Sequence, residues 1–379
     1  MLYYLSLLDS YISELRLFQY ITVRTLGAAA TAFLLSLVMA PGLIRRLRMI
    51  KFSELEEDER VAMLDRSGKV GTPSMGGLMI ITATASSSLL WAIPTNMYIW
   101  LTLSTFCLMG VIGFIDDYSK VKKSGGLSAK MKFSAQLVWA GIVFSVLWSI
   151  PETQERVRDL MVPFFKYPIL DLGLVGGFIF MVLVLVGASN AVNLTDGLDG
   201  LAIGCSNSVA MAYLLLTYVA GHYAFAEYLQ VPFVKGCGEL TVFCGALLGS
   251  GLGFLWYNCH PAKIFMGDTG SLAIGGAIAM LAILIKQELL LIIVGGVFVI
   301  EAASVMIQTG WFKFTRKRYG EGRRVFKCAP LHHHFEMVEK ERALDEDRDP
   351  ELVETVIVTR FCILSIVFAL IGIATLKIR

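Results

Sequence analysis

The chain has 379 residues, of which 56% are apolar and only 17% are charged. A soluble domain carries roughly 25% charged residues, so this composition indicates a membrane protein and leaves no room for a separate soluble domain. The formal net charge of +2 gives no basic excess for neutralising phosphate backbones, which argues against a nucleic-acid partner.

Apolar stretches follow one another along almost the whole chain. A window of roughly 20 apolar residues finds about ten of them. Because lipid excludes unpaired backbone, the sequence predicts an all-α integral membrane protein, one polytopic domain over residues 1–379. The expected spans are 19–44, 73–94, 96–115, 133–150, 169–192, 199–221, 237–257, 270–286, 289–311 and 356–376.

The two ends and the cysteines give little further information. The opening residues MLYYLSLLDS lack the basic region of a cleavable signal, so the first span is expected to be a retained helix. Most cysteines fall inside apolar stretches, and no disulfide framework is expected.

Basic residues are distributed unevenly between the two sides of this layout. Lys and Arg gather in the joints that follow the odd-numbered spans. The positive-inside rule therefore places these joints in the cytoplasm and both termini outside. The same joints contain the polar motifs GFIDDYSKVKKSGGLSAKMK, NAVNLTDGLDG, YNCHPAKIFMGDTGS and APLHHHFE. The candidate active site is thus expected on the cytoplasmic face.

Four acidic residues in these joints are candidate catalytic groups. Asp116 and Asp117 end the third span, Asp196 lies in NAVNLTDGLDG, and Asp268 lies in MGDTGS. Adjacent helical positions diverge by about 100°, so Asp116 and Asp117 are expected to have unequal roles. Acids that converge on one side require a cation, and oxygen-only ligands favour Mg²⁺ or Mn²⁺.

Structural explanations compete with this hypothesis at each position. Asp196 and Asp268 could simply cap the helices that follow them, because Asp is a favoured N-cap residue. The Asp116–Asp117 pair could mark a helix end with Lys120 as its partner. Capping needs one carboxylate only and does not explain Asn190 and Asn193, which share a three-residue spacing with Asp196.

A run of three histidines, His332, His333 and His334, is the most unusual local feature. Near a magnesium site, imidazoles are suited to contacting phosphate oxygens. Zinc is the competing ligand, with Cys328, Cys259 and His260 as possible partners, but no CxxC or HxxxH spacing accompanies the run.

Two further charged residues have alternative interpretations. Lys69 in GKVGTPSMGG is either a phosphate ligand or an ordinary charged loop residue. Glu301 lies near the middle of the ninth span, where a carboxylate must face protein or water. A proton pathway through Glu301 would indicate an ion-coupled transporter. Transporters, however, gather their charged residues at the bilayer midplane, whereas the other acids of interest here lie in the cytoplasmic joints.

The motifs IDDYSK, NAVNLTDGLDG, YNCHPAKIFMGDTGS and PLHHHFE together resemble the polyprenyl-phosphate N-acetylhexosamine-1-phosphate transferases. The resemblance covers nearly the whole chain, and PLHHHFE and GTPSMGG point to the muramoyl-pentapeptide branch. It implies transfer of phospho-MurNAc-pentapeptide from UDP-MurNAc-pentapeptide to undecaprenyl phosphate with Mg²⁺, giving lipid I and UMP. It also implies a homodimer in the lipid bilayer of the bacterial inner membrane.

The resemblance assigns roles to residues by their motif positions. Asp268 is the expected magnesium ligand, and Asp116, Asp117, Asp196, His332 and His333 are the expected catalytic residues. The residues expected to bind substrate are Lys69, Lys120, Lys132, Asn190, Asn193, Asn258, Phe265 and His334. Phe265 is the expected platform for uracil.

Elementary chemistry favours a particular mechanism within this family. A phosphate monoester has its second pKa near 6, so the lipid phosphate is mostly dianionic at pH 7 and already nucleophilic. We therefore expect direct displacement rather than an aspartyl-phosphate intermediate. The alternative within the enzyme class is a transferase that uses UDP-GlcNAc.

Overall fold

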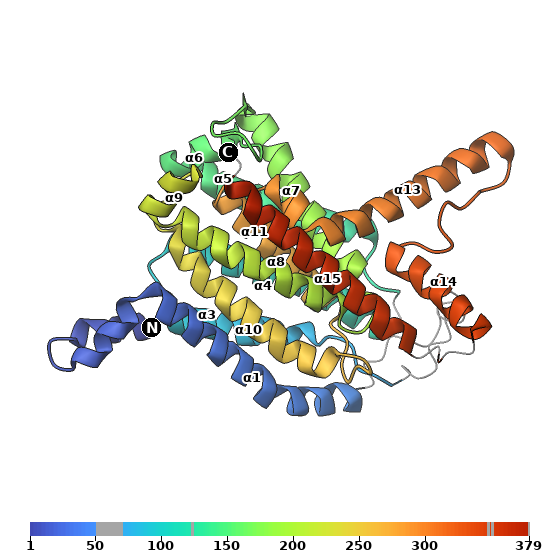
Figure 1. The fold of residues 1–379 in the computed structure, drawn as a ribbon, viewed down its shortest axis with the longest axis horizontal. Coiled ribbons are helices and arrows are strands. Elements are labelled where there is room, and N and C mark those ends of the chain that lie inside the picture. Colours follow the sequence, from blue (N-terminus) through green and yellow to red (C-terminus); the bar gives the residue numbers. More distant parts are fainter. Residues whose placement is uncertain (51–70, 123–124, 347–348, 350–351, 378–379) are drawn as a thin grey trace.

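The structure is a computed structural model that describes residues 1–50, 71–122, 125–346, 349 and 352–377. It consists almost entirely of helices packed side by side (Figure 1). One two-stranded antiparallel sheet pairs β1 (Asp159–Leu160) with β2 (Leu170–Asp171). An all-α membrane protein, as predicted, is confirmed.

Nine helices among the described residues are long and apolar enough to cross a membrane. The helices of this set are α1 (Ile21–Met49), α4 (Met97–Val121), α5 (Ala129–Ser149), α7 (Gly173–Thr195), α8 (Leu201–Ala220), α10 (Leu240–Asn258), α11 (Gly267–Leu284), α13 (Gly296–Tyr319) and α15 (Leu352–Ala374). The remaining predicted span, 73–94, corresponds to α3 (Gly77–Trp91), which is apolar but only 15 residues long.

Shorter helices join and flank the long ones. Their bounds are η1 (Leu2–Leu8), η2 (Ser13–Gln19), α6 (Pro151–Arg158), α9 (Tyr223–Leu229), η4 (Cys237–Glu239), α12 (Leu290–Val294), α14 (Leu331–Asp345) and η5 (Thr375–Lys377). The predicted ninth span, 289–311, was wrong in its bounds: the chain forms α12, passes Gly295, and then continues in α13 as far as Tyr319. Apolar periodicity alone does not register this interruption.

Helix α11 forms the centre of the bundle. Of its 18 residues, 94% are buried inside the protein, and α3, α4 and α7 pack against it. The contacts are close because glycines meet backbone: a Cβ added at Gly77 would lie 2.1 Å from the Gly270 nitrogen, and one at Gly113 would lie 2.1 Å from the Asp268 carbonyl oxygen. Small residues of this kind let helices in membranes approach closely. The packing therefore fixes the first turn of α11 against α3 and α4.

A buried ion pair connects α1 to the segment before α10. The Arg24 guanidinium donates to both carboxylate oxygens of Glu239 at 2.6 Å, and Glu239 also accepts a hydrogen bond from the Ile93 backbone at 3.0 Å. Both side chains are almost fully buried. A bidentate pair whose carboxylate also accepts a backbone hydrogen bond offsets much of the cost of burying the two charges.

Removal of one member of this pair is expected to destabilise the protein more than removal of both. Glu239→Ala leaves the Arg24 charge buried without a partner, at a cost of about 3–5 kcal/mol. The double variant Arg24→Met/Glu239→Gln keeps an acceptor for Ile93 and should unfold at an intermediate temperature. Thermal unfolding in detergent tests this order, and a Glu239→Ala variant as stable as the wild-type protein would contradict it.

Candidate active site

Three acidic side chains meet at the end of α4 and the start of α11. Carboxylate oxygens of Asp116, Asp117 and Asp268 all lie within 4.8 Å of one another. Asp116 and Asp117 are each 1% exposed, whereas Asp268 is partly exposed. The predicted convergence of these three acids is confirmed. A set of oxygen-only ligands of this kind fits a hard divalent cation such as Mg²⁺.

Asp117 accepts hydrogen bonds from the backbone at the start of α11. Its Oδ1 accepts a hydrogen bond from the Asp268 nitrogen at 3.1 Å, and its Oδ2 accepts from the nitrogen and the hydroxyl of Thr269 at 2.9 and 2.6 Å. The first backbone N–H groups of a helix have no partner within that helix. Asp117 of α4 therefore caps α11 from outside, and Asp268 is not the cap.

Gly267 makes this arrangement possible. It begins α11 with a φ of +71°, and a Cβ at this position would lie 2.7 Å from Oδ2 of Asp117 and 2.8 Å from Oγ of Ser74. Glycine adopts positive φ at little cost and leaves space for the carboxylate. The glycine of GDTGS thus allows α4 to cap α11.

Two lysines neutralise most of the negative charge in the cluster. Lys132 Nζ lies 2.6 Å from an oxygen of Asp116 and 2.6 Å from an oxygen of Asp268. Lys120 Nζ lies 3.0 Å from Asp116 and 3.4 Å from Asp268. Three carboxylates therefore face two ammonium groups in a largely buried position. Both lysines were predicted as members of this cleft, and the structure places both in contact with its acids.

The two asparagines near the end of α7, Asn190 and Asn193, lie in different environments. Asn193 donates to Oδ1 of Asp268 at 2.7 Å and to the Ser271 hydroxyl at 2.9 Å, so it belongs to the acid cluster. Asn190 donates instead to Gln136 of α5 at 3.0 Å and to the Val186 carbonyl. Asn190 therefore links α7 to α5.

Asp196 lies apart from the other three acids. It follows the last residue of α7 at the C-cap position, and α8 has Gly200 as its N-cap residue. Of the four acids that were expected to converge, three do, since among the described residues the group around Asp268 does not include Asp196. Asp196 precedes Gly197, which packs against the histidine motif.

The three histidines at the start of α14 occupy two different environments. His332 is fully buried, and its Nε2 would lie 2.2 Å from a Cβ added at Gly197. His333 Nδ1 lies 3.0 Å from Glu336, while His334 Nδ1 accepts a hydrogen bond from the Lys327 nitrogen at 3.2 Å. His332 and His333 thus lie against the NLTDG loop, and His334 faces the segment after α13.

Glu301 supports the histidine motif from α13. Its carboxylate accepts a hydrogen bond from the His332 nitrogen at 3.1 Å, and its Oε2 lies 3.2 Å from Nδ1 of the same residue. Both side chains are fully buried. Glu301 therefore caps α14 through the His332 backbone and lies beside the His332 ring, which explains how a carboxylate is accommodated in an apolar span.

A second cluster of ionisable groups was missed by sequence reasoning. Asp199 Oδ2 lies 3.1 Å from both His260 Nδ1 and the Ala262 nitrogen, and the Asp199 nitrogen donates to Glu354 at 2.8 Å. These bonds join the NLTDGLDG loop to the segment after α10 and to the start of α15. The sequence signals were the second acid of NLTDGLDG and His260, which was considered only as a zinc partner of the histidine run.

Asn258 and Phe265 occupy the same region. The Asn258 side chain accepts from the Gly200 nitrogen at 3.0 Å and donates to the Ile264 carbonyl at 2.9 Å. The Phe265 nitrogen donates to the Pro73 carbonyl at 2.8 Å, and Phe265 is partly exposed.

Lys69 lies outside the described residues. Among the described residues, a second group of three side chains that could hold a metal ion consists of Asp199, His260 and Glu354; it includes His260 of the zinc alternative, but neither the histidine run nor a cysteine.

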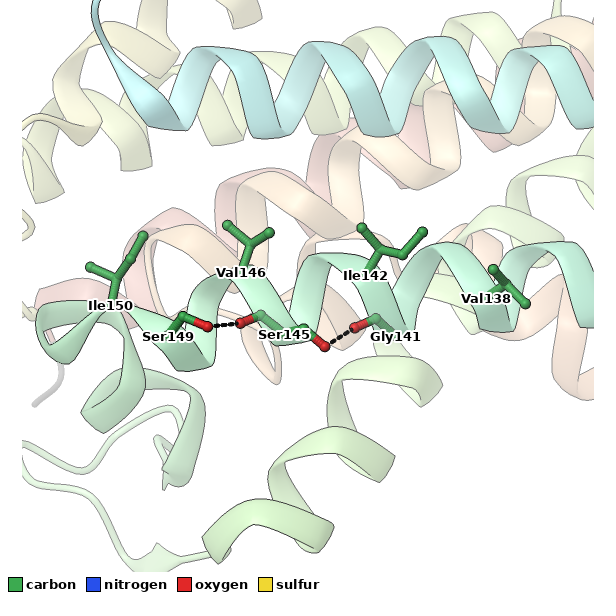
Figure 2. A pocket seen from close by; sticks show the side chains of 7 residues that line it. All are labelled: Val138, Gly141, Ile142, Ser145, Val146, Ser149 and Ile150. Atoms are coloured by element: carbon green, nitrogen blue, oxygen red, sulfur yellow. Dashed lines mark hydrogen bonds between the residues drawn. The ribbon is translucent and has the colours of Figure 1, made fainter.

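A hollow in the surface lies elsewhere, on α5, with a volume of about 670 Å³. Figure 2 shows its lining, which runs along a single helix from Val138 to Ile150. Its two serine hydroxyls donate to carbonyls of α5 itself, Ser145 to Gly141 and Ser149 to Ser145. The hollow offers apolar surface and no charged group, so the chemistry belongs to the acid cluster.

Comparisons with known proteins agree with this site. Residues 99–286, which contain the acid cluster, match the model of glycosyl transferase family 4. The chain is 48% identical over 382 residues, all of both chains, to a phospho-N-acetylmuramoyl-pentapeptide-transferase of Solidesulfovibrio magneticus. The chain belongs to this family. Relatives of the same name from Methylacidiphilum infernorum, 46% identical with full coverage of both chains, and Maridesulfovibrio salexigens, 48% identical over 98% of both, extend the match.

Membership of the phospho-N-acetylmuramoyl-pentapeptide-transferase family agrees with the resemblance inferred from the four motifs. The matches extend beyond the shared 99–286 region to the histidine motif and α15. The whole arrangement, including Glu301 and the Asp199 cluster, therefore lies within the part of the chain that these transferases share.

Loss of the external cap is expected to weaken the centre of the bundle. Asp117→Ala removes the acceptor of three hydrogen bonds at the start of α11, and the loss of a helix cap costs about 1–2 kcal/mol. Asp117→Asn retains one oxygen and should cost less. Thermal unfolding in detergent measures both, and equal unfolding temperatures for Asp117→Ala and the wild-type protein would refute the capping role.

Proposed function

We propose that this protein transfers phospho-MurNAc-pentapeptide from UDP-MurNAc-pentapeptide to undecaprenyl phosphate, forming lipid I and releasing UMP. The observation that supports this most strongly is the meeting of Asp116, Asp117 and Asp268 with Lys120 and Lys132 in a chain that matches named transferases over its full length. Carboxylates that bind a cation, beside ammonium groups that bind phosphate, suit the transfer of a phosphoryl group.

We further propose that Asp268 and Asp116 hold a Mg²⁺ ion. When bound, such an ion would neutralise charge on the diphosphate of the donor. Asp117 is already engaged by the backbone of α11, so its contribution is to fix the position of Asp268. Asn193 orients Asp268 from the other side through its bond to Oδ1.

The lysines and histidines supply the remaining contacts in this proposal. Lys120 and Lys132 would turn from the carboxylates toward phosphate oxygens when the donor binds. His332 and His333, with Asp196, would contact the donor from the NLTDG side, and His334 would hold the segment that follows α13. The acceptor phosphate is mostly dianionic at pH 7, so it attacks directly without a strong base.

The location of the reaction follows from the substrates. A UDP-linked donor is available on the cytoplasmic face, so we propose that the acid cluster lies at the cytoplasmic surface of the bacterial inner membrane and both termini lie outside. We also propose a homodimer, as the family resemblance implies.

Reaction of engineered terminal cysteines with an impermeant thiol reagent on intact cells tests the orientation, and labelling of both termini is expected if they lie outside.

Substitution of Asp268 is expected to abolish UMP release and to weaken metal binding. Asp268→Asn retains the size of the side chain and removes its charge, and we expect activity to fall at least ~100-fold, in the range of other electrostatic contributions to catalysis. Binding of Mn²⁺, followed by electron paramagnetic resonance, should weaken in parallel. Glu321→Gln is the matched control, since Glu321 is an exposed acid outside the cluster.

The same assay distinguishes the alternatives. UMP release with UDP-MurNAc-pentapeptide and not with UDP-GlcNAc is expected, and the reverse preference would refute the proposed donor. Full activity of Asp268→Asn with unchanged Mn²⁺ binding would refute the proposed role of the acid cluster.

Glu301 is expected to act as a positioning residue for His332. Glu301→Ala removes both the cap of α14 and the acceptor beside Nδ1, whereas Glu301→Gln keeps an acceptor for the His332 nitrogen. We expect turnover to fall about tenfold in the first variant and less in the second, since each lost hydrogen bond to a charged group is worth about 1.5–3 kcal/mol. Rates of UMP release across pH test this, with thermal unfolding as the control for stability.

A purely structural role for Glu301 would lower the unfolding temperature and leave the pH profile unchanged. Wild-type turnover in Glu301→Ala would contradict the positioning role, and wild-type turnover together with an unchanged unfolding temperature would contradict both roles.

A further inference from the structure

The end of α13 and the segment after it form an unusual surface, which we call the basic arm and define as residues 311–327. In Figure 1, α13 leaves the bundle and its far end projects beyond the neighbouring helices. Its last nine residues, WFKFTRKRY, contain four aromatic and four basic residues, and all of them except Thr315 are exposed. The basic arm is therefore both aromatic and strongly positive around its circumference.

Among the residues that the structure describes, all but one of the cations of the basic arm lack an acidic partner. Glu321 is the only acidic residue between Ala302 and Phe335. Within the described part of the chain, Lys327 is the only arm cation with an ion pair, to Glu341. The remaining exposed cations are Lys313, Arg316, Lys317, Arg318, Arg323 and Arg324. Such a concentration of unpaired positive charge attracts an anionic surface.

The arm has a defined conformation. The Arg323 nitrogen donates to the Thr315 hydroxyl at 2.9 Å, so the segment after Gly320 folds back along α13. Gln308 accepts hydrogen bonds from the Val325 and Phe326 nitrogens at 2.9 and 3.0 Å and donates to the Phe326 carbonyl at 3.1 Å. The six exposed cations therefore lie on an ordered structure made of the end of α13 and the segment bonded to it.

Neither water nor hydrocarbon suits this surface. In water, Trp311, Phe312, Phe314 and Tyr319 would each expose between 36% and 55% of their surface, which makes four large apolar side chains exposed within nine residues. In the hydrocarbon core, each Lys or Arg would be strongly disfavoured. The interface between the two satisfies both groups, because aromatic rings sit at headgroup depth and basic side chains reach the phosphates.

The position of the arm is consistent with a membrane surface. The segment after it leads into α14, whose His332 packs against Gly197 beside the end of α7. The arm is therefore joined to the side of the bundle that carries the acid cluster. Arg318 lies over the rings of Phe314 and Tyr319 at 6.0 and 5.6 Å, so cations and aromatic rings share one surface.

We propose that the basic arm lies in the headgroup layer of the bilayer, on the side of the acid cluster, and binds the phosphate groups of anionic phospholipids. The partner is a lipid surface rather than a protein or a nucleic acid, because the aromatic rings require an apolar environment beside the phosphates. Neither the acid cluster nor the histidine motif takes part in this binding.

The fluorescence of Trp311 tests this proposal in the intact protein. The protein is reconstituted in vesicles of phosphatidylcholine and phosphatidylglycerol in equal amounts, with bromine on the acyl chains of either one lipid or the other. The contribution of Trp311 is the difference between the wild-type protein and Trp311→Phe. We expect brominated phosphatidylglycerol to quench it at least ~twofold more than brominated phosphatidylcholine, since each basic residue near the surface attracts anionic lipid.

The variant Lys313→Gln/Arg316→Gln/Lys317→Gln/Arg318→Gln should lose this preference. The matched control Arg45→Gln/Arg46→Gln/Arg48→Gln, which neutralises the basic end of α1, should retain it. Raising the salt concentration should reduce the preference in the wild-type protein, because salt screens exposed charges. The salt measurement uses the wild-type protein and therefore does not depend on correct folding of the fourfold variant.

Two results would overturn the proposal. No quenching of Trp311 by either brominated lipid would show that the arm lies in water, where a protein or nucleic acid could bind it. Equal quenching by both lipids at low salt would show that the arm enters the membrane without selecting anionic headgroups.

Discussion

The hydrogen bonds that the first turn of α11 donates to Asp117 are the interaction on which the site depends. A helix that begins inside a bundle exposes backbone N–H groups where water cannot satisfy them. Asp117 fills this need from α4, so the link that stabilises the central helix also holds Asp268 beside Asp116. Stability of the bundle and geometry of the site therefore rest on the same carboxylate.

This link requires that α4 and α11 approach at backbone distance. Gly113 permits the approach, because any side chain there would strike the Asp268 carbonyl. Gly267 permits the turn that starts α11, with its φ of +71°. In a bilayer the apolar faces of helices gain little from leaving lipid, so close packing through small residues takes over much of the role that the hydrophobic effect has in water.

Much of this could be predicted from the sequence, and the remainder has identifiable physical reasons. The apolar spans and the convergence of Asp116, Asp117 and Asp268 follow from hydropathy and from motifs placed at helix ends. The break between α12 and α13 did not follow, because Gly295 and Gly296 interrupt an apolar run without changing its hydropathy. The separate place of Asp196 depends on where the chain leaves α7, which spacing along the sequence does not determine.

The roles of the lysines could not be read from the sequence either, because an ammonium group near acids serves equally as partner or as ligand. The geometry separates the two lysines. Lys132 bridges Asp116 and Asp268 at 2.6 Å each, with 22% of its side chain exposed, whereas Lys120 makes longer contacts and is 37% exposed. An anion that approaches the cluster from solvent therefore meets Lys120 first. Lys132 can release its carboxylates only when other positive charge replaces it, because two buried acids that face each other unneutralised would repel.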